Sequence, residues 1–384
     1  MSKRMTISDI ARLAGVSKAT VSRVLNHKPD VDPVTRERIL RIMEEHNFVP
    51  SVAASGLAGG KGHLIAVLVP ALTWPLIPDI MRGIAEVVEE TSYELVLYSI
   101  KTSNHERDRS DVINRILANR LIAGLLAIFP GQSARYLPAL QRQGLPVVLL
   151  DDQGLPPEQI PWITADNRAG AYAATRHLIE LGHRRIAHIQ GPLKYQVSRE
   201  RFQGYCDALQ DYGIPLDPSL ILQGDFMPPG GRACACQFFA LPERTRPTAI
   251  FAASDLMAYG VMGAAEEFGL RIPEDVSLVG FDDIPSSGHM RPPLTTVRQP
   301  LSEMGQCALE LLLSLLEAPE RSGGALLRAS PLLARYAGSS QRQLQSSQTS
   351  ITATIESAEP AHFRLATTLV VRATTAPPPC YARM

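Results

Sequence analysis

Between residues 63 and 300, short apolar runs alternate with stretches whose apolar residues recur at helical spacing. Apolar strands that alternate with helices are typical of parallel sheets covered on both faces. The stretch is long for one sheet, so we expect two doubly wound lobes, with a ligand cleft beyond the carboxyl ends of their strands. The expected strands are Leu64–Val69, Leu95–Ile100, Ile122–Phe129, Val147–Leu150, Ile186–Ile189, Leu220–Leu222, Ala249–Ala252 and Val276–Val279, and the expected helices are Ile80–Glu90, Ala169–Leu181, Phe202–Tyr212, Asp255–Phe268 and Ser302–Leu316.

Charge is distributed unevenly along the 384-residue chain, although its 38 basic and 38 acidic residues cancel. Residues 1–61 contain ten Lys/Arg and six Asp/Glu, an excess of four positive charges, so the remainder has an excess of four negative charges. This split excludes a uniformly basic coat and favours a small phosphate-attracting N-terminal module on a mildly acidic body. The charged N-terminus has no apolar core of a secretion signal. The apolar runs are far shorter than the ~20 residues that span a bilayer. We therefore expect a cytoplasmic protein with no membrane partner.

Residues 6–26 have the pattern of a helix-turn-helix. Thr6 is a good N-cap for a first helix, Gly15 tolerates the left-handed backbone of a tight turn, and Ser17 caps a second helix. A third helix is expected to begin with Asp32 as its N-cap and Pro33 in its first turn. The residues expected to form the core of this all-α domain are Ile7, Ile10, Ala11 and Ala14 of the first helix, Val21, Val24 and Leu25 of the second, and Ile39, Ile42, Met43 and His46 of the third.

The opposite face of the second helix combines small residues with hydrogen-bond donors, which suits close approach to the major groove of DNA. Lys18 and Arg23 suit guanine O6 and N7, and the methyl group of Ala19 suits thymine. The alternative is a helical bundle whose polar face only meets water. Phosphate contacts, which fix register without reading sequence, are assigned to Thr6, Ser17, Thr20, Ser22 and Asn26.

The segment TISDIARLAGVSKATVSRVLN resembles the N-terminal signature of the lactose-repressor (LacI/GalR) family. The resemblance covers nearly the whole chain to about residue 317 and includes LATTLVVRATTAPP near the end. It implies a three-helix DNA-binding domain, a hinge helix, and a two-lobed α/β core similar to periplasmic sugar-binding proteins. The other motifs that carry it, in chain order, are DPVTRERI, NFVPSVAASGLAGG, LGHRRIAHIQGP, RFQGYCDAL, SDLMAYG, IPEDVSLVGFDD and PLTTVRQP.

The resemblance also predicts the domain boundaries. Both Leu332–Ala337 and Leu369–Thr374 resemble the family's final strand, and the second matches better, which makes roughly residues 318–361 an insertion. Its Ser/Gln/Thr-rich part, residues 339–360, is expected to be disordered. The predicted units are a DNA-binding domain at 1–49, a hinge at 50–62 and an effector-binding and dimerisation core at 63–384, with an N-lobe at about 63–160 and 295–320 and a C-lobe at about 161–292 and 362–376.

The hinge contains one further candidate DNA contact. Leu57 matches the family's leucine that wedges into the minor groove when the hinge folds on operator DNA. Where the family often has Arg-Ser before this leucine, the chain has Ser55 and Gly56. Glycine costs roughly 0.5–1 kcal/mol of helix stability relative to alanine, so the departure weakens the expected contact. The alternative is a plain flexible linker.

Candidate effector contacts are carried over from the family only where the motifs align. Arg201 in SRERFQGY matches the arginine that grips the ligand, and Asp282 in GFDD matches a carboxylate that accepts ligand hydroxyls or amines. Alternatively, Arg201 pairs only with a neighbouring carboxylate, Trp74 packs between the lobes, and Asp255 caps a helix. The remaining effector candidates are Trp74, Asp151, Tyr195, Phe226 and Ser254.

Two other protein classes fit the sequence less well. The chain has no G-x-S-x-G, H-E-x-x-H or strand-linked G-x-G-x-x-G motif, and Ser55 stands where a P-loop needs its first glycine, so an enzyme is not expected. A periplasmic binding protein would match residues 63–317 alone, without the DNA reader. The five cysteines and the histidines lack metal spacing, so neither a metal nor a cofactor is expected. We therefore predict a homodimeric regulator, a repressor, that binds palindromic double-stranded operator DNA and responds to a small effector, a carbohydrate.

Overall fold

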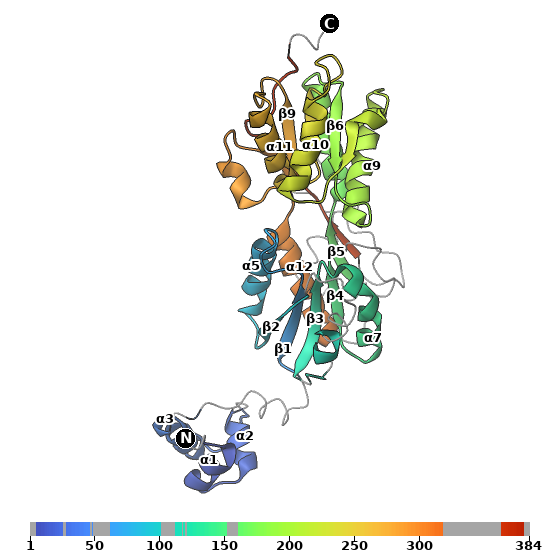
Figure 1. The fold of residues 1–384 in the computed structure, drawn as a ribbon. Coiled ribbons are helices and arrows are strands. Elements are labelled where there is room, and N and C mark those ends of the chain that lie inside the picture. Colours follow the sequence, from blue (N-terminus) through green and yellow to red (C-terminus); the bar gives the residue numbers. More distant parts are fainter. Residues whose placement is uncertain are drawn as a thin grey trace, which may run out of the picture.

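In the computed structural model, a three-helix domain is followed by two lobes that each contain a β-sheet (Figure 1). The residues that it describes are 5–25, 28–46, 48, 62–100, 112–116, 118–119, 121–151, 160–317 and 362–379. The predicted hinge and the predicted insertion at 318–361 therefore fall almost wholly outside the described residues.

The N-terminal domain consists of α1 (Ile7–Ala14), α2 (Lys18–Leu25) and α3 (Pro33–Glu45). A capping box begins α1: the Asp9 carboxylate accepts the Thr6 N–H at 3.0 Å, and Thr6 Oγ1 accepts the Asp9 N–H at 3.4 Å. Gly15 ends the helix at a φ of +65°, as the turn requires. The predicted core forms except at His46, which is exposed because α3 ends one residue earlier; Phe48 packs against the core instead.

The first lobe is a parallel sheet of six strands in the order β11-β5-β4-β3-β1-β2. Helices α5 (Ile77–Val88) and α12 (Leu301–Glu317) pack on one face, and α7 (Leu137–Arg142), which follows the short helix η1 (Gly131–Tyr136), packs on the other. The strands are β1 (Leu64–Val69), β2 (Glu94–Ser99), β3 (Ile122–Ile128), β4 (Val147–Leu150), β5 (Trp162–Ala165) and β11 (His362–Leu365).

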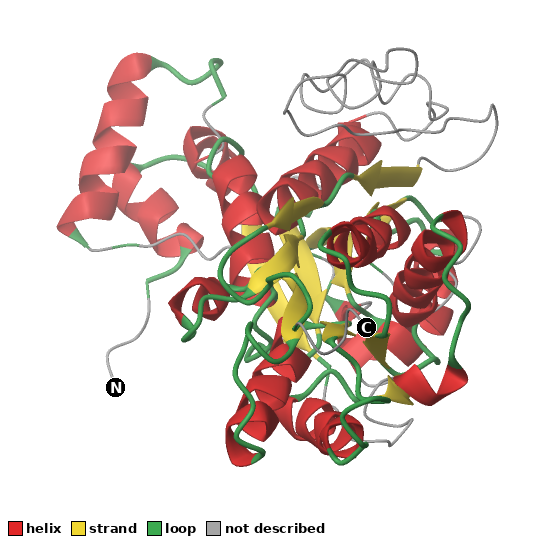
Figure 2. Cartoon of the chain, turned by 90° about the horizontal axis from the view of Figure 1, so that it is seen from above, coloured by secondary structure: helices red, strands yellow, loops and turns green. Residues whose placement is uncertain are grey.

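The second lobe has six strands in the order β12-β10-β9-β8-β6-β7, all parallel except β12, which runs antiparallel to β10. Helices α10 and α11 cover one face and α8 and α9 the other. Figure 2 shows helices lying around the central strands. The elements are β6 (Ile186–Gln190), β7 (Ile221–Gln223), β8 (Ala249–Ala252), β9 (Ser277–Asp282), β10 (Thr295–Arg298), β12 (Thr368–Val370), α8 (Asn167–Glu180), α9 (Gln196–Asp211), α10 (Pro228–Phe239), α11 (Asp255–Glu267), and the short helices η2 (Pro218–Leu220) and η3 (Pro285–His289).

The chain crosses between the lobes three times: after β5, after β10, and between β11 and β12. These crossings correct the predicted lobe boundaries. β5 belongs to the first lobe rather than the second, and β10 belongs to the second lobe rather than the first. The expected final strand at Leu369–Thr374 is a strand only at its start, in β12. β11, which the predicted boundaries place in the C-lobe, extends the sheet of the first lobe instead. Apolar patterning shows where a strand lies but not which sheet it joins, because pairing depends on distant segments.

Candidate functional site

The structure exposes one side of α2 and buries the other. Val21 and Val24 are buried, whereas Lys18, Ala19 and Arg23 are exposed. The Arg23 guanidinium lies 3.4 Å from the Asp30 carboxylate, but both side chains are more than half exposed, so the contact is weak enough to yield to a phosphate or base.

Three of the predicted phosphate contacts, Thr6, Ser17 and Thr20, lie at or near the N-terminal ends of α1 and α2, and Ser22 lies further along α2. Thr6 and Ser17 are exposed, and Thr20 and Ser22 are partly buried. Ser17 Oγ accepts the backbone N–H of Thr20 at 3.1 Å, so this residue is the helix cap that the sequence predicts. Helix N-termini present unpaired N–H groups to anions, which adds to the attraction for phosphate. Asn26 and Leu57 lie outside the described residues.

A cavity between the lobes contains about 630 Å³ of empty space, part of it open to solvent. All seven predicted effector residues line it, from both sheets. Sequence reasoning missed the other lining residues, and Gln299, in the motif PLTTVRQP, is the one whose polarity offered a signal. The full lining is Trp74, Pro75, Leu76, Phe129, Asp151, Tyr195, Val197, Arg201, Phe226, Ser254, Leu256, Asp282, Ile284 and Gln299.

Arg201 extends from α9 into the cavity wall and is 4% exposed. Its Nε donates to Asn167 Oδ1 at 2.9 Å and its Nη1 donates to the Ala253 carbonyl at 2.6 Å. The guanidinium also lies over the Phe281 ring, 3.7 Å from the centroid. Burial lowers the pKa of Arg201, and the neighbouring carboxylates oppose this effect. Within the described residues Nη2 has no hydrogen-bond partner, so two donors remain for a ligand.

Asp282 ends β9 at the cavity wall. Its Oδ1 accepts from Gln299 Nε2 at 2.7 Å and from Arg201 Nη1 at 3.4 Å, so the expected pairing of Arg201 with a carboxylate is present. Among the described residues Oδ2 has no hydrogen-bond donor. Burial raises the pKa of Asp282 to about 6, against the lowering effect of Arg201 and Gln299. A ligand hydroxyl that donates to Oδ2 would therefore stabilise the ionised form.

The aromatic side chains form one pair on each lobe. Trp74 packs edge-on against Phe129, with centroids 5.4 Å apart, in the first lobe. Tyr195 stacks on Phe226, with centroids 6.1 Å apart, in the second lobe. Trp74 therefore packs within its own lobe while lining the cavity. Aromatic faces on both walls suit a ligand ring that presents C–H groups or a π-face.

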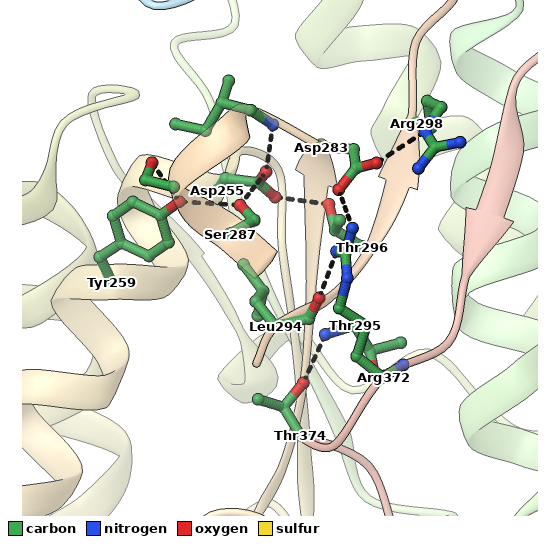
Figure 3. Close-up of polar contacts among 12 residues, drawn as sticks. Asp255, Tyr259, Asp283, Ser287, Leu294, Thr295, Thr296, Arg298, Arg372 and Thr374 are labelled. Atoms are coloured by element: carbon green, nitrogen blue, oxygen red, sulfur yellow. Dashed lines mark hydrogen bonds and ion pairs between the residues drawn. The ribbon is translucent and has the colours of Figure 1, made fainter. Parts of the chain in front are cut away.

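Ser254, and not Asp255 as the sequence suggested, caps a helix. It is the N-cap of α11, and its Oγ accepts the Met257 N–H at 3.3 Å. The Asp255 carboxylate instead accepts from the Ile284 N–H at 3.0 Å, from Ser287 Oγ at 2.6 Å, and from Thr296 Oγ1. Burial, with a contribution from Asp282, raises the pKa of Asp255 to about 8. Asp255 thus fastens the loop after β9 to α11 and does not line the cavity (Figure 3).

The comparisons with known proteins agree with this arrangement. A family model described as bacterial regulatory proteins of the lacI family matches residues 6–51, and a periplasmic binding protein-like domain matches residues 175–335. The ribose operon repressor of Haemophilus influenzae is 35% identical over 317 residues, which cover 83% of this chain and 93% of that relative. The chain belongs to the LacI family. It is a DNA-binding transcriptional regulator with the helix-turn-helix and two-lobed core that the sequence predicts.

This LacI-family regulator is also similar to other members of the family in sequence and in structure. The transcriptional repressor CytR of Escherichia coli strain K12 is 33% identical over 331 residues, covering 86% of this chain and 95% of that relative. The lac repressor dimer bound to operator and the anti-inducer ONPF superposes with a TM-score of 0.77 at 29% identity, covering 97% of this chain and all of that one. A LacI-family regulator from Enterococcus faecium with bound ribose has a TM-score of 0.62 at 25% identity, covering 82% and 99% of the two chains.

In this LacI-family chain, no helix within the described ranges is long and apolar enough to cross a membrane. Of the five cysteines, four lie in the described part and all four are free thiols; Cys380 lies outside it. Clusters of three or more His, Cys, Asp or Glu side chains that could hold a metal ion are absent from the same part of the chain.

Proposed function

We propose that this regulator is a homodimeric repressor whose affinity for a palindromic operator is set by a small ligand in the interlobe cavity. The observation that supports the ligand site is that one cavity gathers Arg201, Asp282 and Asp151 with aromatic walls from both lobes. A ligand that contacts both lobes binds better to one lobe orientation than to another. It therefore shifts the equilibrium between conformations that differ in operator affinity.

The ligand that fits this cavity best is an uncharged sugar. Arg201 is the only cation among the described lining residues, and Asp282 already lies beside it, whereas Asp151 adds a second negative charge. A phosphate group would meet two carboxylates and a guanidinium that is already paired. Hydroxyl groups both donate and accept, so they can use Arg201 Nη2 and Asp282 Oδ2 together.

For DNA reading we propose that α2 enters the major groove and presents Lys18, Ala19 and Arg23 to the bases. Thr6, Ser17, Thr20, Ser22 and Asn26 contact phosphates in this arrangement, and Leu57 contacts the minor groove. Two copies related by a two-fold axis place two α2 helices on two half-sites of one operator. Repression follows from occupancy of the operator, and a protein that acts on bacterial operator DNA works in the cytoplasm.

The test begins with selection of DNA by the full chain from a random double-stranded library, followed by affinity measurements with and without sugars. D-ribose is the first compound, since one relative is named a ribose operon repressor and one structural neighbour holds ribose. We expect a palindromic consensus and a change in operator affinity with one uncharged sugar, but no change with its phosphate ester. Failure to enrich any consensus would refute the DNA-binding proposal, and a response to the phosphate ester alone would refute the ligand class.

A matched pair of arginine variants tests the ligand site. Arg201→Gln is expected to bind the selected operator but to lose the ligand response. Arg199→Gln changes an exposed arginine two positions away on the same helix, and it should respond as the wild type does.

A further inference from the structure

Two consecutive aspartates at the end of β9 serve different parts of the molecule. Asp282 lines the cavity, whereas Asp283, whose side chain is 5% exposed, does not. Both residues have left-handed φ angles, +117° for Asp282 and +57° for Asp283. Two such residues in succession leave the backbone between the two carboxylates few allowed conformations.

Asp283 lies between two arginines from separate segments of the chain (Figure 3). Its Oδ2 accepts from Arg298 Nε at 2.7 Å, and its Oδ1 accepts from Arg372 Nη2 at 2.6 Å. The carboxylate therefore bridges the last residue of β10 and the segment that follows β12. The first of these segments adjoins the second crossing, and the second is separated from the third crossing only by the three residues of β12.

The first of these segments leads directly into the other lobe. Arg298 ends β10, and α12 of the first lobe begins at Leu301. Between them, the Gln299 N–H donates to the Asp282 carbonyl at 3.3 Å and Gln299 Nε2 donates to the Asp282 carboxylate at 2.7 Å. The two aspartates thus hold two successive residues of the crossing.

The second segment, which contains Arg372, is hydrogen-bonded to β10 and to the residue before it. Arg372 Nη1 donates to the Leu294 carbonyl at 2.8 Å, and the Arg372 N–H donates to Thr295 Oγ1 at 3.0 Å. This arginine follows β12, whose chain arrives from β11 in the first lobe. Asp283 therefore joins the second crossing to the chain that follows β12, the edge strand that the third crossing enters.

The loop beyond the two aspartates is fixed on its other side. Asp255 of α11 accepts hydrogen bonds from the Ile284 N–H and from Ser287 Oγ, and Tyr259 OH also bonds to Ser287 Oγ at 2.7 Å (Figure 3). A movement of Asp282 is for this reason not absorbed by the loop that follows it. The remaining attachments of the two aspartates lead toward the crossings, from Asp282 to Gln299 and from Asp283 to the two arginines.

We propose that Asp283 is a positioning residue that couples ligand contact at Asp282 to the crossing at Arg298 and, through Arg372, to the strand β12 that the third crossing enters. This inference rests on the proposed function, because it assumes that a ligand in the cavity alters operator affinity. Asp283 does not touch the ligand in this arrangement. Its loss is expected to leave ligand binding in place and to uncouple it from the DNA-binding domain.

The test compares Asp283→Asn with Asp275→Asn in the full-length protein. Asparagine tolerates left-handed φ angles, so the first change removes charge without adding backbone strain. Asp275 is a matched control, because it also accepts two hydrogen bonds from arginine side-chain nitrogens of the second lobe, Arg271 Nε and Nη2, each at 2.9 Å, away from the crossings. Operator affinity is measured with and without D-ribose, and D-ribose affinity is measured by calorimetry without DNA.

In Asp283→Asn we expect the ligand-induced change in operator affinity to be at least about fivefold smaller than in the wild type. Allosteric couplings of this kind typically change affinity by ~5–150-fold. The affinity for D-ribose should stay within about threefold of the wild-type value, and Asp275→Asn should match the wild type in both. Full coupling in Asp283→Asn would overturn the proposal, as would an equal loss in Asp275→Asn.

A wild type that does not respond to D-ribose excludes this sugar as the effector, and the role of Asp283 is then tested without a ligand. Amide hydrogen exchange without ligand then decides this role. Faster exchange at Gln299 and Arg372 in Asp283→Asn than in Asp275→Asn supports the proposal, and equal exchange overturns it. If Asp283→Asn does not fold, Arg298→Gln takes its place. It removes one arm of the bridge at a side chain that is 57% exposed.

Discussion

His183 makes the stability of the second lobe sensitive to acid. The ring is 1% exposed, its Nδ1 lies 2.9 Å from Thr248 Oγ1, and its Nε2 lies 2.9 Å from the Ala376 carbonyl. Because a carbonyl only accepts, Nε2 carries the proton and Nδ1 accepts from Thr248. The neutral ring thereby fastens the C-terminal segment to the sheet. Burial lowers its pKa from 6.5 to about 4.

The direction of the pH effect follows from the lowered pKa. The folded protein keeps this histidine neutral, whereas the unfolded chain binds a proton on it as the pH falls below 6.5. Its stabilisation is therefore present above pH 6.5 and is lost between pH 6.5 and about 4. At about 1.36 kcal/mol per pKa unit, the loss between pH 7.5 and pH 5 is about 2 kcal/mol. Asp255 and Asp282 have raised pKa values and act in the opposite direction, so the wild-type profile alone does not isolate His183.

The assay therefore compares His183→Gln with the wild type by urea unfolding at pH 7.5 and pH 5, with circular dichroism as the readout. The variant should be less stable at pH 7.5, and this deficit should shrink by about 2 kcal/mol at pH 5 because glutamine does not titrate. His289→Gln, at an exposed histidine of the same lobe, is the control and should show no such change. A deficit of equal size at both pH values would refute the assignment of a neutral buried ring.

Three further substitutions test the DNA reader, the cavity and the lobe packing. Lys18→Ala should weaken operator binding, which titrations at several salt concentrations would measure. If Lys18 contacts a phosphate, the slope of log K against log[salt] should fall in magnitude by about one; if it contacts guanine, specificity at one base should relax by about 1–3 kcal/mol. Gly191→Ala places a Cβ 2.1 Å from the Phe226 ring, so calorimetry should show at least about tenfold weaker sugar binding with unchanged circular dichroism. Gly83→Ala places a Cβ 1.8 Å from the Ser302 carbonyl, which separates α5 from α12, and thermal unfolding should show a loss of about 1–3 kcal/mol.

The helix-turn-helix was predictable because its determinants are local. The Thr6 cap, the Gly15 turn and the apolar stripes each lie within a few residues, and all three form as expected. The one core residue predicted wrongly, His46, lies just past the end of α3, where the helical spacing no longer applies. Helix ends are set by capping interactions that apolar periodicity does not contain.

The lobe assignment shows the limit of the same reasoning. β5 and β10 are short strands whose sheet is decided by pairing with segments far away in the sequence. The cavity depended on the same long-range arrangement, and its seven predicted residues came from the family resemblance rather than from periodicity. Gln299 lines the cavity and holds Asp282, and it was missed because its polarity after a strand was the only signal and does not by itself specify a role.

Backbone strain links the fold to the cavity in a way that the sequence does not disclose. Among the described residues five non-glycine positions have positive φ, and four of them line the cavity: Phe129, Asp151, Phe226 and Asp282. Each lies at or just beyond the carboxyl end of a strand, where a parallel sheet delivers its loops to one edge. Left-handed backbone costs roughly 1–2 kcal/mol at each such residue.

This cost is large against a typical stability of about 5–15 kcal/mol, so it persists only where the surrounding packing imposes it. The packing is visible at Gly191, where any Cβ would collide with Phe226, and at Asp282, which Gln299 and Arg201 hold from two sides. The cavity walls are thus kept in position before any ligand arrives. A ligand then has little left to order within either lobe, and more of its binding free energy is available to change how the two lobes are oriented.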